Sequence, residues 1–346
     1  MSRAASSRPD NVAIDLVEIG NAPAWERRLR DIPHAFAHTH DHCHAMRLTT
    51  GYDTMLWCHD AGTSHTVCPV AERRWADAVD IVTPFGFSGF VGNTAGADVS
   101  LAWRTWCRER SYVCGYVALN PVLANVACMD PLEVVSGQTL FLLDLTQEES
   151  VLRARLHASL RHKHRTMAPT INSRDDPREP LARFFVDNFH ACFAGRGAGS
   201  AYDLKPATVE ALVQSPSVLL VGVRGVDGIE SVTLFGHTPY CADALFNVCT
   251  PAGRPHAFTL LWAGAMLLKS DRVPWLNLGG GIEEHDGVAT FKRRFGGAEL
   301  PFRALKQVFD RTRYRQLCAQ AGVDADMRSG YFPAYRGVGA LARSAP

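Results

Sequence analysis

The order of predicted elements in the second half of this 346-residue chain constrains its fold more than any other feature of the sequence. Three strand-like apolar runs follow one another closely, and a helical segment and a further strand come directly after them. Such a meander with a crossover helix predicts a mixed sheet with helices on both faces. The predicted elements are a strand at 139–145, a helix after Thr146, helices at 181–194 and after Pro206, strands at 217–223, 230–236 and 244–249, a helix at 257–269, a strand at 273–278, a helix at 288–294, a strand at 300–309 and a helix at 311–321.

A capping signal stands at the start of the first of these helices. Thr146 is followed three residues later by Glu149, which is the spacing of a capping box. Leucines then recur at helical spacing from Leu152 to Leu160. Together they predict one helix that runs on through Met167.

The first half of the chain is harder to assign, but its elements come in a similar order. Although the halves share no sequence repeat, this order predicts a tandem α/β protein built from two domains with mixed sheets, which the chain length also favours. The predicted elements are strands at 11–19, 54–58, 66–70 and 78–82, a helix at 102–110 and a strand at 112–118. We expect an N-terminal domain at 1–138, a C-terminal domain at 139–309, and a C-terminal helix and tail at 310–346 that packs back on the N-terminal domain.

Three ordered segments carry a family resemblance. They are the run Asp-Ile-Val-Thr-Pro-Phe-Gly-Phe-Ser-Gly at 80–89, the run Leu-Leu-Asp-Leu at 142–145 with the basic helix that follows it, and the segment 276–296, which holds a glycine turn, an Asp-Gly pair and Phe-Lys-Arg-Arg-Phe-Gly. Together they resemble the FemAB family of aminoacyltransferases, which are tandem GNAT proteins. The element order likewise resembles the GNAT acetyltransferase fold. The resemblance covers residues 80–309.

The chain departs from the family pattern at three aromatic positions. Phe85 and Phe87 stand where the family has tyrosines, and Phe246 lies on a strand where the family often shows one. Each change removes a hydroxyl group that could hydrogen bond a substrate. The chain also lacks the long heptad-patterned arm of some members. These departures suggest an acceptor other than peptidoglycan precursors, and lineages without the arm include enzymes that modify peptide or nucleoside natural products.

The resemblance implies an N-acyltransferase that forms an amide bond without a resident cofactor. Its donor would be an aminoacyl-tRNA, and its acceptor an amine of a small peptide, nucleoside or cell-wall precursor. A CoA thioester is the alternative donor, but residues 250–256 do not match the usual GNAT pyrophosphate loop, which counts against CoA. A third alternative is a non-catalytic protein of the same fold that binds RNA or a metabolite.

Lys292 and Asp80 are the candidate catalytic residues. By resemblance, Lys292 would stabilise the tetrahedral oxyanion or the departing ribose oxygen, whereas periodicity alone favours a solvated lysine beside other basic residues. Asp80 could orient the attacking ammonium or accept its proton, or it could simply begin a turn at the end of a strand. The residues expected to bind substrate are Phe85, Phe87, Phe246, Gly279, Gly280, Asp286 and Phe291.

A basic stripe follows the predicted helix after Thr146. Arg153, His157, Arg161 and Arg165 are spaced four residues apart, so they would share one helix face. Because the formal net charge is only +1, any RNA contact must come from such a local patch. The stripe could follow tRNA phosphates, bind a diphosphate, or remain a solvated face. The residues expected to bind tRNA phosphates are Arg161, Lys163, Arg165 and Arg293.

Five histidines crowd one short segment: His34, His38, His40, His42 and His44. On a strand the last four would share a face and could bind zinc, whereas on a helix they would point in several directions. We expect no metal site. The ten cysteines form no Cys-x-x-Cys pair and are expected to be buried thiols in a reducing compartment. Without a signal peptide or a membrane span, a cytoplasmic location is expected.

Overall fold

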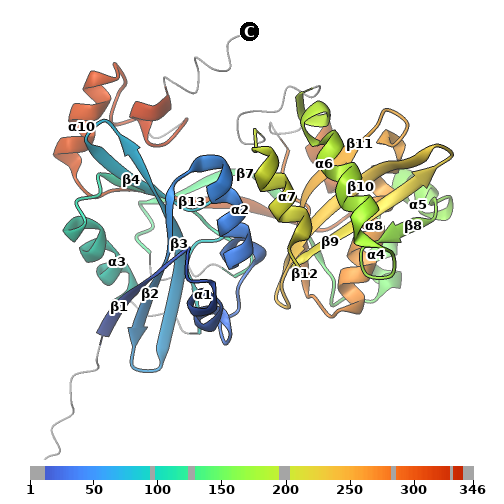
Figure 1. Ribbon diagram of the computed structural model, residues 1–346, viewed down its shortest axis with the longest axis horizontal. Helices are drawn as coiled ribbons and strands as arrows, with labels where there is room; N and C mark the ends of the chain where they lie inside the picture. Colours follow the sequence, from blue (N-terminus) through green and yellow to red (C-terminus); the bar gives the residue numbers. More distant parts are fainter. Residues whose placement is uncertain are drawn as a thin grey trace, which may run out of the picture.

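The computed structural model describes residues 12–93, 98–123, 129–194, 203–281, 286–327 and 330–337. Two lobes lie side by side, and one mixed sheet of thirteen strands runs through both (Figure 1). The strand order along the sheet is β1-β2-β3-β4-β6-β13-β7-β12-β11-β10-β9-β8, with β5 paired to β3. The predicted α/β class with mixed sheets is therefore confirmed.

The first lobe contains a three-stranded antiparallel meander, β2-β3-β4, followed by the crossover helix α3 and by β6, which pairs in parallel with β4. An aromatic cluster around Trp57 and Trp103 packs between α3 and the sheet. The elements of this lobe are β1 (Val12–Glu18), α1 (Ala22–Leu29), the 3-10 helix η1 (Phe36–His38), α2 (His40–Thr50), β2 (Asp53–Ala61), β3 (Ser64–Trp75), β4 (Ala78–Val82), β5 (Val91–Gly92), α3 (Asp98–Glu109) and β6 (Cys114–Ala118).

The second lobe repeats this order. The meander β9-β10-β11 precedes the crossover helix α8, and β12 pairs in parallel with β11. The repeat confirms the tandem arrangement that the element order predicts. The elements of this lobe are α4 (Glu149–Arg155), α5 (Ala158–Arg165), β8 (Thr170–Asn172), α6 (Arg178–Ala194), α7 (Pro206–Gln214), β9 (Val218–Gly225), β10 (Gly228–His237), β11 (Ala242–Cys249), the 3-10 helix η3 (Arg254–His256), α8 (Ala257–Ser270), β12 (Trp275–Asn277) and α9 (Gly287–Arg293).

Two long central strands join the lobes. β7 (Val134–Asp144) pairs with β12 and β13, and β13 (Ala298–Val308) pairs with β7 and β6. The two strands are antiparallel to each other and lie at the centre of the sheet. The expected domain boundary between residues 138 and 139 falls within β7, so the lobes share a continuous hydrogen-bonded core rather than a linker.

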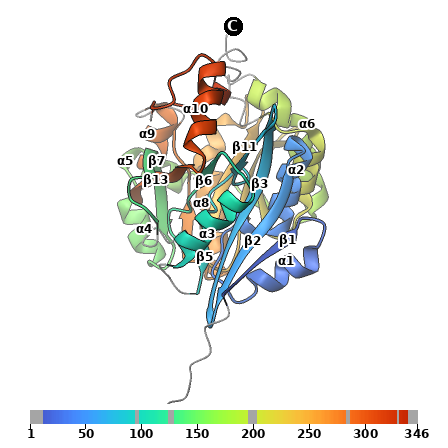
Figure 2. The same ribbon diagram turned by 90° about the vertical axis from the view of Figure 1, so that its left-hand side faces the viewer.

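The C-terminal part of the chain returns to the first lobe. The helix α10 (Arg311–Gln320) lies near β6 (Figure 2). Together with residues 331–337 it forms a small core with β4 and β6. Tyr314, Leu317 and Tyr335 are buried there against Ala78 and Cys114. This packing ties the end of the chain to the first lobe, whereas the residues just before it belong to the central strand β13.

The helix predicted after Thr146 departs from the expectation in two ways. No capping box forms, because the Thr146 hydroxyl donates to Asp144 and Glu148 occupies the N-cap position without a side-chain bond. The helix also breaks at Leu156, whose ψ of 137° is extended. His157 then caps the separate helix α5 by accepting from the amide of Ser159. The four-residue spacing from Arg153 to Arg165 therefore does not build one continuous stripe.

Within the described part of the chain, no helix has both the length and the apolar character needed to cross a bilayer. The nine described cysteines are free thiols, and seven of them are buried.

Candidate active site

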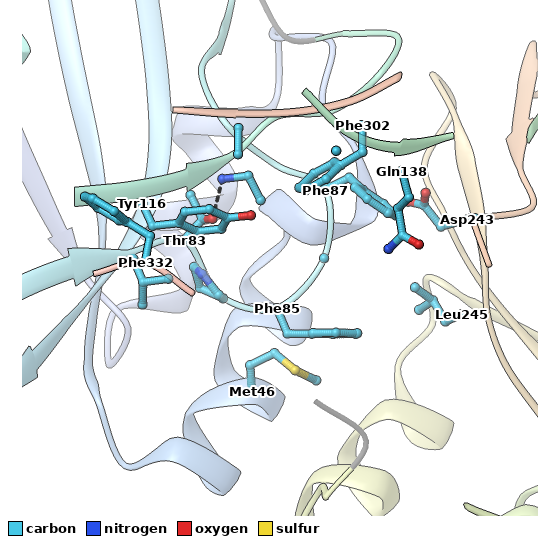
Figure 3. A pocket seen from close by; sticks show the side chains of 18 of the residues that line it. Met46, Thr83, Phe85, Phe87, Tyr116, Gln138, Asp243, Leu245, Phe302 and Phe332 are labelled. Atoms are coloured by element: carbon cyan, nitrogen blue, oxygen red, sulfur yellow. Dashed lines mark hydrogen bonds between the residues drawn. The ribbon is translucent and has the colours of Figure 1, made fainter. Parts of the chain in front are cut away.

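A cavity of about 1100 Å³ opens between the two lobes. Its walls come from the loop after β4, from the central strands β7 and β13, and from the turn after β12. Tyr116 and Phe332 lie toward one side of it, and Asp243 and Leu245 toward the other (Figure 3). A space of this size, lined by both lobes, can admit two substrates at once.

The second-lobe wall forms where two parallel strands diverge. β11 and β12 pair only at Ala242 with Leu276 and at Asp243 with Asn277. Beyond this point β12 ends and the chain turns at Gly279, whose φ of +74° lies in the left-handed region that favours glycine. The cavity lining therefore includes Asp243, Ala244 and Leu245 of β11 together with the glycine turn.

Lys292 reaches this turn from the short helix α9. Asp286 caps the helix by accepting from the amide of Ala289 at 2.6 Å. The Lys292 ammonium donates to the carbonyl oxygen of Gly280 at 2.7 Å and lines the cavity. Burial lowers the pKa of Lys292 to about 8, although the charge of Asp286 opposes that shift. The ammonium is therefore charged below that pH and lies beside a half-buried backbone turn.

Asp243 lies in the same wall, and the sequence prediction missed it. Its side chain is 4% exposed, and the carboxylate accepts from Asn277 Nδ2 at 2.9 Å. Burial raises the pKa of Asp243 to about 7, against the opposite effect of that hydrogen bond. The predicted strand began at Ala244, one residue too late to include it. A polar residue at the edge of an apolar strand was the available signal.

The predicted aromatic residues divide into two groups. Phe85 and Phe87 line the cavity, whereas Phe246 and Phe291 lie behind its lining among the described residues. Phe85 is 40% exposed and stacks on Phe246 at 6.3 Å, so Phe246 supports the wall from below. Phe87 packs edge-on against Phe302 at 5.6 Å.

Of the predicted glycine and polar residues of the substrate site, some line the cavity and one does not. Gly279 and Gly280 line the cavity. Asp286 caps α9 instead, so its contribution is to hold the helix that presents Lys292.

The histidine segment anchors the loop that carries Phe85. His42 Nε2 donates to the Phe85 carbonyl oxygen at 2.5 Å, and His38 Nε2 donates to that of Gly89 at 3.2 Å. Burial lowers the pKa of His42 to about 4 and that of His38 to about 3, so both rings are neutral at pH 7. Among the described residues no three metal-ligating side chains converge. These histidines therefore position the loop.

Asp80 lies outside the described lining of the cavity. Its carboxylate is 1% exposed and accepts from Arg73 Nε at 2.6 Å, from Arg336 Nε at 2.7 Å and from the Tyr335 hydroxyl at 3.0 Å. Every direction of approach is thus occupied by a donor from the protein. This geometry favours a structural role for Asp80 over that of a proton acceptor, because the carboxylate holds the C-terminal segment on the first lobe.

The predicted phosphate-binding residues lie away from the cavity lining. Arg161, Lys163 and Arg165 are exposed on α5, which packs against α8 at the outer side of the second lobe (Figure 1). Arg293 forms a 2.9 Å ion pair with Glu299 and lies over the ring of Phe141. The exposed face of α5 is free to meet a polyanion, whereas Arg293 already has a partner.

No protein-family model matches the sequence, and no curated protein matches it significantly. Among solved structures, the crystal structure of FemX superposes with a TM-score of 0.65 at 11% identity, covering 87% of this chain and 99% of that one. The DUF2156 C-terminal domain of a protein assigned as a lysylphosphatidylglycerol synthetase from Agrobacterium fabrum gives 0.56 at 12% identity, over 90% and 98% of the two chains. L-PGS from Bacillus licheniformis gives 0.51 at 10% identity, over 84% and 92%. The chain therefore shares its two-lobed α/β fold with these proteins, and at 10–12% identity the likeness concerns the fold alone.

Proposed function

We propose that the protein is an N-acyltransferase that moves an aminoacyl group from a charged tRNA to an amine of a small peptide, nucleoside or cell-wall precursor. The observation that carries this proposal is the Lys292 ammonium, held at the wall of a cavity shared by two lobes. Fold alone does not determine activity, so the proposal depends on what this site can do.

Acyl transfer from an ester to an amine needs alignment of the two reactants and a fixed cation near the developing oxyanion. The described structure gives Lys292 one hydrogen-bond acceptor, the Gly280 carbonyl oxygen. Because an ammonium has three N–H donors, two remain for a substrate oxygen. With a pKa of about 8, Lys292 carries its charge at neutral pH.

The start of α8 favours tRNA over CoA as the donor. GNAT enzymes that use CoA place its pyrophosphate before this long helix. Here Pro255 contributes no N–H group, and the Glu230 carboxylate stands 3.6 Å from His256 Nε2. A carboxylate at this position repels an anionic pyrophosphate.

Variants of Lys292 test the proposal directly. Transfer of labelled amino acids from total charged tRNA to methoxyamine, a small surrogate acceptor, measures turnover above the uncatalysed rate. We expect Lys292→Ala to lower kcat by about 10²–10³-fold, the usual effect of removing one oxyanion donor. Lys205→Ala, at an exposed lysine, is the matched control and should leave kcat unchanged. Equal turnover by wild type and Lys292→Ala would refute this role of Lys292.

Donor choice is tested by binding. Titrations with total charged tRNA and with acetyl-CoA, each at several salt concentrations, separate the two donors. We expect tRNA affinity to fall steeply with salt, and the variant lacking Arg161, Lys163 and Arg165 to show a slope shallower by about 2. Arg108→Ala with Arg110→Ala, on the first lobe, is the control. Saturable binding of acetyl-CoA without tRNA binding would move the protein to the alternative donor, and tRNA binding without transfer would favour the non-catalytic alternative.

A further inference from the structure

We propose that Asp243 accepts the proton that the attacking amine loses during acyl transfer. This role rests on the function proposed above, and it places the base in the second lobe instead of at Asp80. The carboxyl group of Asp243 lines the cavity, whereas that of Asp80 does not.

One short turn holds both Asp243 and the catalytic cation. The Asn277 side chain donates to the Asp243 carboxylate at 2.9 Å and accepts from the Gly279 amide at 2.8 Å. The next carbonyl along, that of Gly280, accepts from Lys292. Residues 277–280 thus position a carboxylate and an ammonium in the same cavity wall. In the proposed reaction the attacking amine contacts the carboxylate and the carbonyl oxygen of the donor contacts the ammonium.

The surroundings of Asp243 leave its carboxylate available to a substrate. Asn277 is its one hydrogen-bond partner among the described residues, and no ion pair with it is found there. A buried carboxylate without a cation favours its protonated form, which makes the ionised form a stronger base. A pKa of about 7 matches the condition for general-base catalysis near neutral pH.

The titratable groups near Asp243 are few. Cys241, the residue before β11, is buried, and burial raises its pKa well above the usual value, so it stays neutral. On the neighbouring strand β10, Gly236 pairs with Asp243, and the next residue His237 has its pKa lowered by burial. β12 contributes the uncharged Asn277, and α9 brings Lys292 to the same cavity.

The reaction balances with these two groups. The amine nitrogen forms a bond to the acyl carbon, and its proton passes to the Asp243 carboxylate. The bond from that carbon to the ribose oxygen then breaks, and the leaving oxygen takes a proton from the Lys292 ammonium. Asp243 returns a proton to Lys292 through water, so that the net change moves one proton from nitrogen to the leaving oxygen.

The test is the pH dependence of transfer from total charged tRNA to methoxyamine, which stays a neutral amine across the range used. An ascending limb near pH 7 then does not come from the acceptor, and its loss in Asp243→Asn separates the carboxyl group from the α-amino group of the donor, which is the same for both proteins. We expect kcat to fall about 10²–10⁴-fold in Asp243→Asn with little change in KM, and the limb to disappear. Asp243→Glu should recover part of the rate. Asp187→Asn, an exposed aspartate of α6, is the matched control.

Two outcomes would overturn the proposal, and they can be told apart. If Asp243→Asn keeps the wild-type kcat and pH profile, Asp243 is not the proton acceptor and the acyl transfer stands. If the wild-type protein transfers no acyl group from charged tRNA or from acetyl-CoA, the proposed function fails and the role of Asp243 fails with it.

Discussion

Two buried aspartates lie on corresponding strands of the two lobes, and their surroundings are opposite. Asp80 lies on β4 and Asp243 on β11, each the third strand of its meander and each followed by a crossover helix. Two arginines and a tyrosine bind the Asp80 carboxylate. The Asp243 carboxylate has one amide partner and faces the cavity.

The difference shows that burial alone does not decide what a carboxylate does. Asp80 is surrounded by charge-assisted hydrogen bonds, so it fixes the C-terminal segment to the first lobe. Within the described part of the chain no cation pairs with Asp243, so its ionisation is unfavourable and the carboxyl group stays reactive. A buried aspartate on the third meander strand thus contributes to stability in one lobe and, in our proposal, to chemistry in the other.

Removing Asp80 should have the largest effect on stability. Asp80→Ala leaves the buried Arg73 and the partly buried Arg336 without their partner, and we expect a loss of about 3–5 kcal/mol. Urea unfolding at neutral pH measures it. Asp77→Ala, which breaks the ion pair of a 75% exposed aspartate with Arg313, is the control and should cost under about 1 kcal/mol. A similarly small loss for Asp80→Ala would contradict the structural role.

Asp243→Asn should instead stabilise the folded protein. Folding raises the pKa of Asp243 to about 7, so the protonated carboxyl group contributes to stability at low pH. This contribution is complete below the pKa of the unfolded chain and is lost as the pH rises to about 7. Asparagine cannot ionise and keeps an acceptor for Asn277. We expect it to raise the free energy of unfolding by about 2–4 kcal/mol near pH 8 and by little near pH 4. Denaturation at both pH values tests this, and an equal change at both would count against a raised pKa.

The smallest of these effects is expected for Asn277→Ala, as a shift in the pH profile of transfer. The Asn277 amide favours the ionised form of Asp243, so its loss raises the pKa of that carboxyl further. A hydrogen bond of about 1 kcal/mol corresponds to less than one pH unit. The ascending limb of the methoxyamine profile should move up by that amount while the descending limb, set by Lys292, stays near pH 8. An unmoved ascending limb would mean that Asn277 does not control this titration.

Periodicity predicted most of the fold because strands and helices bury apolar faces. It failed at the start of α2, where alternating histidines allowed both a strand and a helix. Thr39 decides for the helix by capping it through the amide of His42. Motif resemblance found Lys292 and the glycine turn. It could not reveal that Arg336, 256 residues away, binds the Asp80 carboxylate, because that contact exists only in the folded chain. Asp243 was missed for a different reason, because the predicted strand began at Ala244, whereas β11 begins at Ala242.

The most direct test of the account compares two variants by one measurement: kcat per folded molecule with charged tRNA and methoxyamine, for Asp80→Asn and Asp243→Asn. We predict that Asp80→Asn is less stable but keeps nearly the wild-type kcat once the unfolded fraction is subtracted. We also predict that Asp243→Asn is at least as stable as wild type and has lost nearly all turnover. The reverse pattern, with activity lost in folded Asp80→Asn and kept in Asp243→Asn, would place the chemistry in the first lobe and contradict the account.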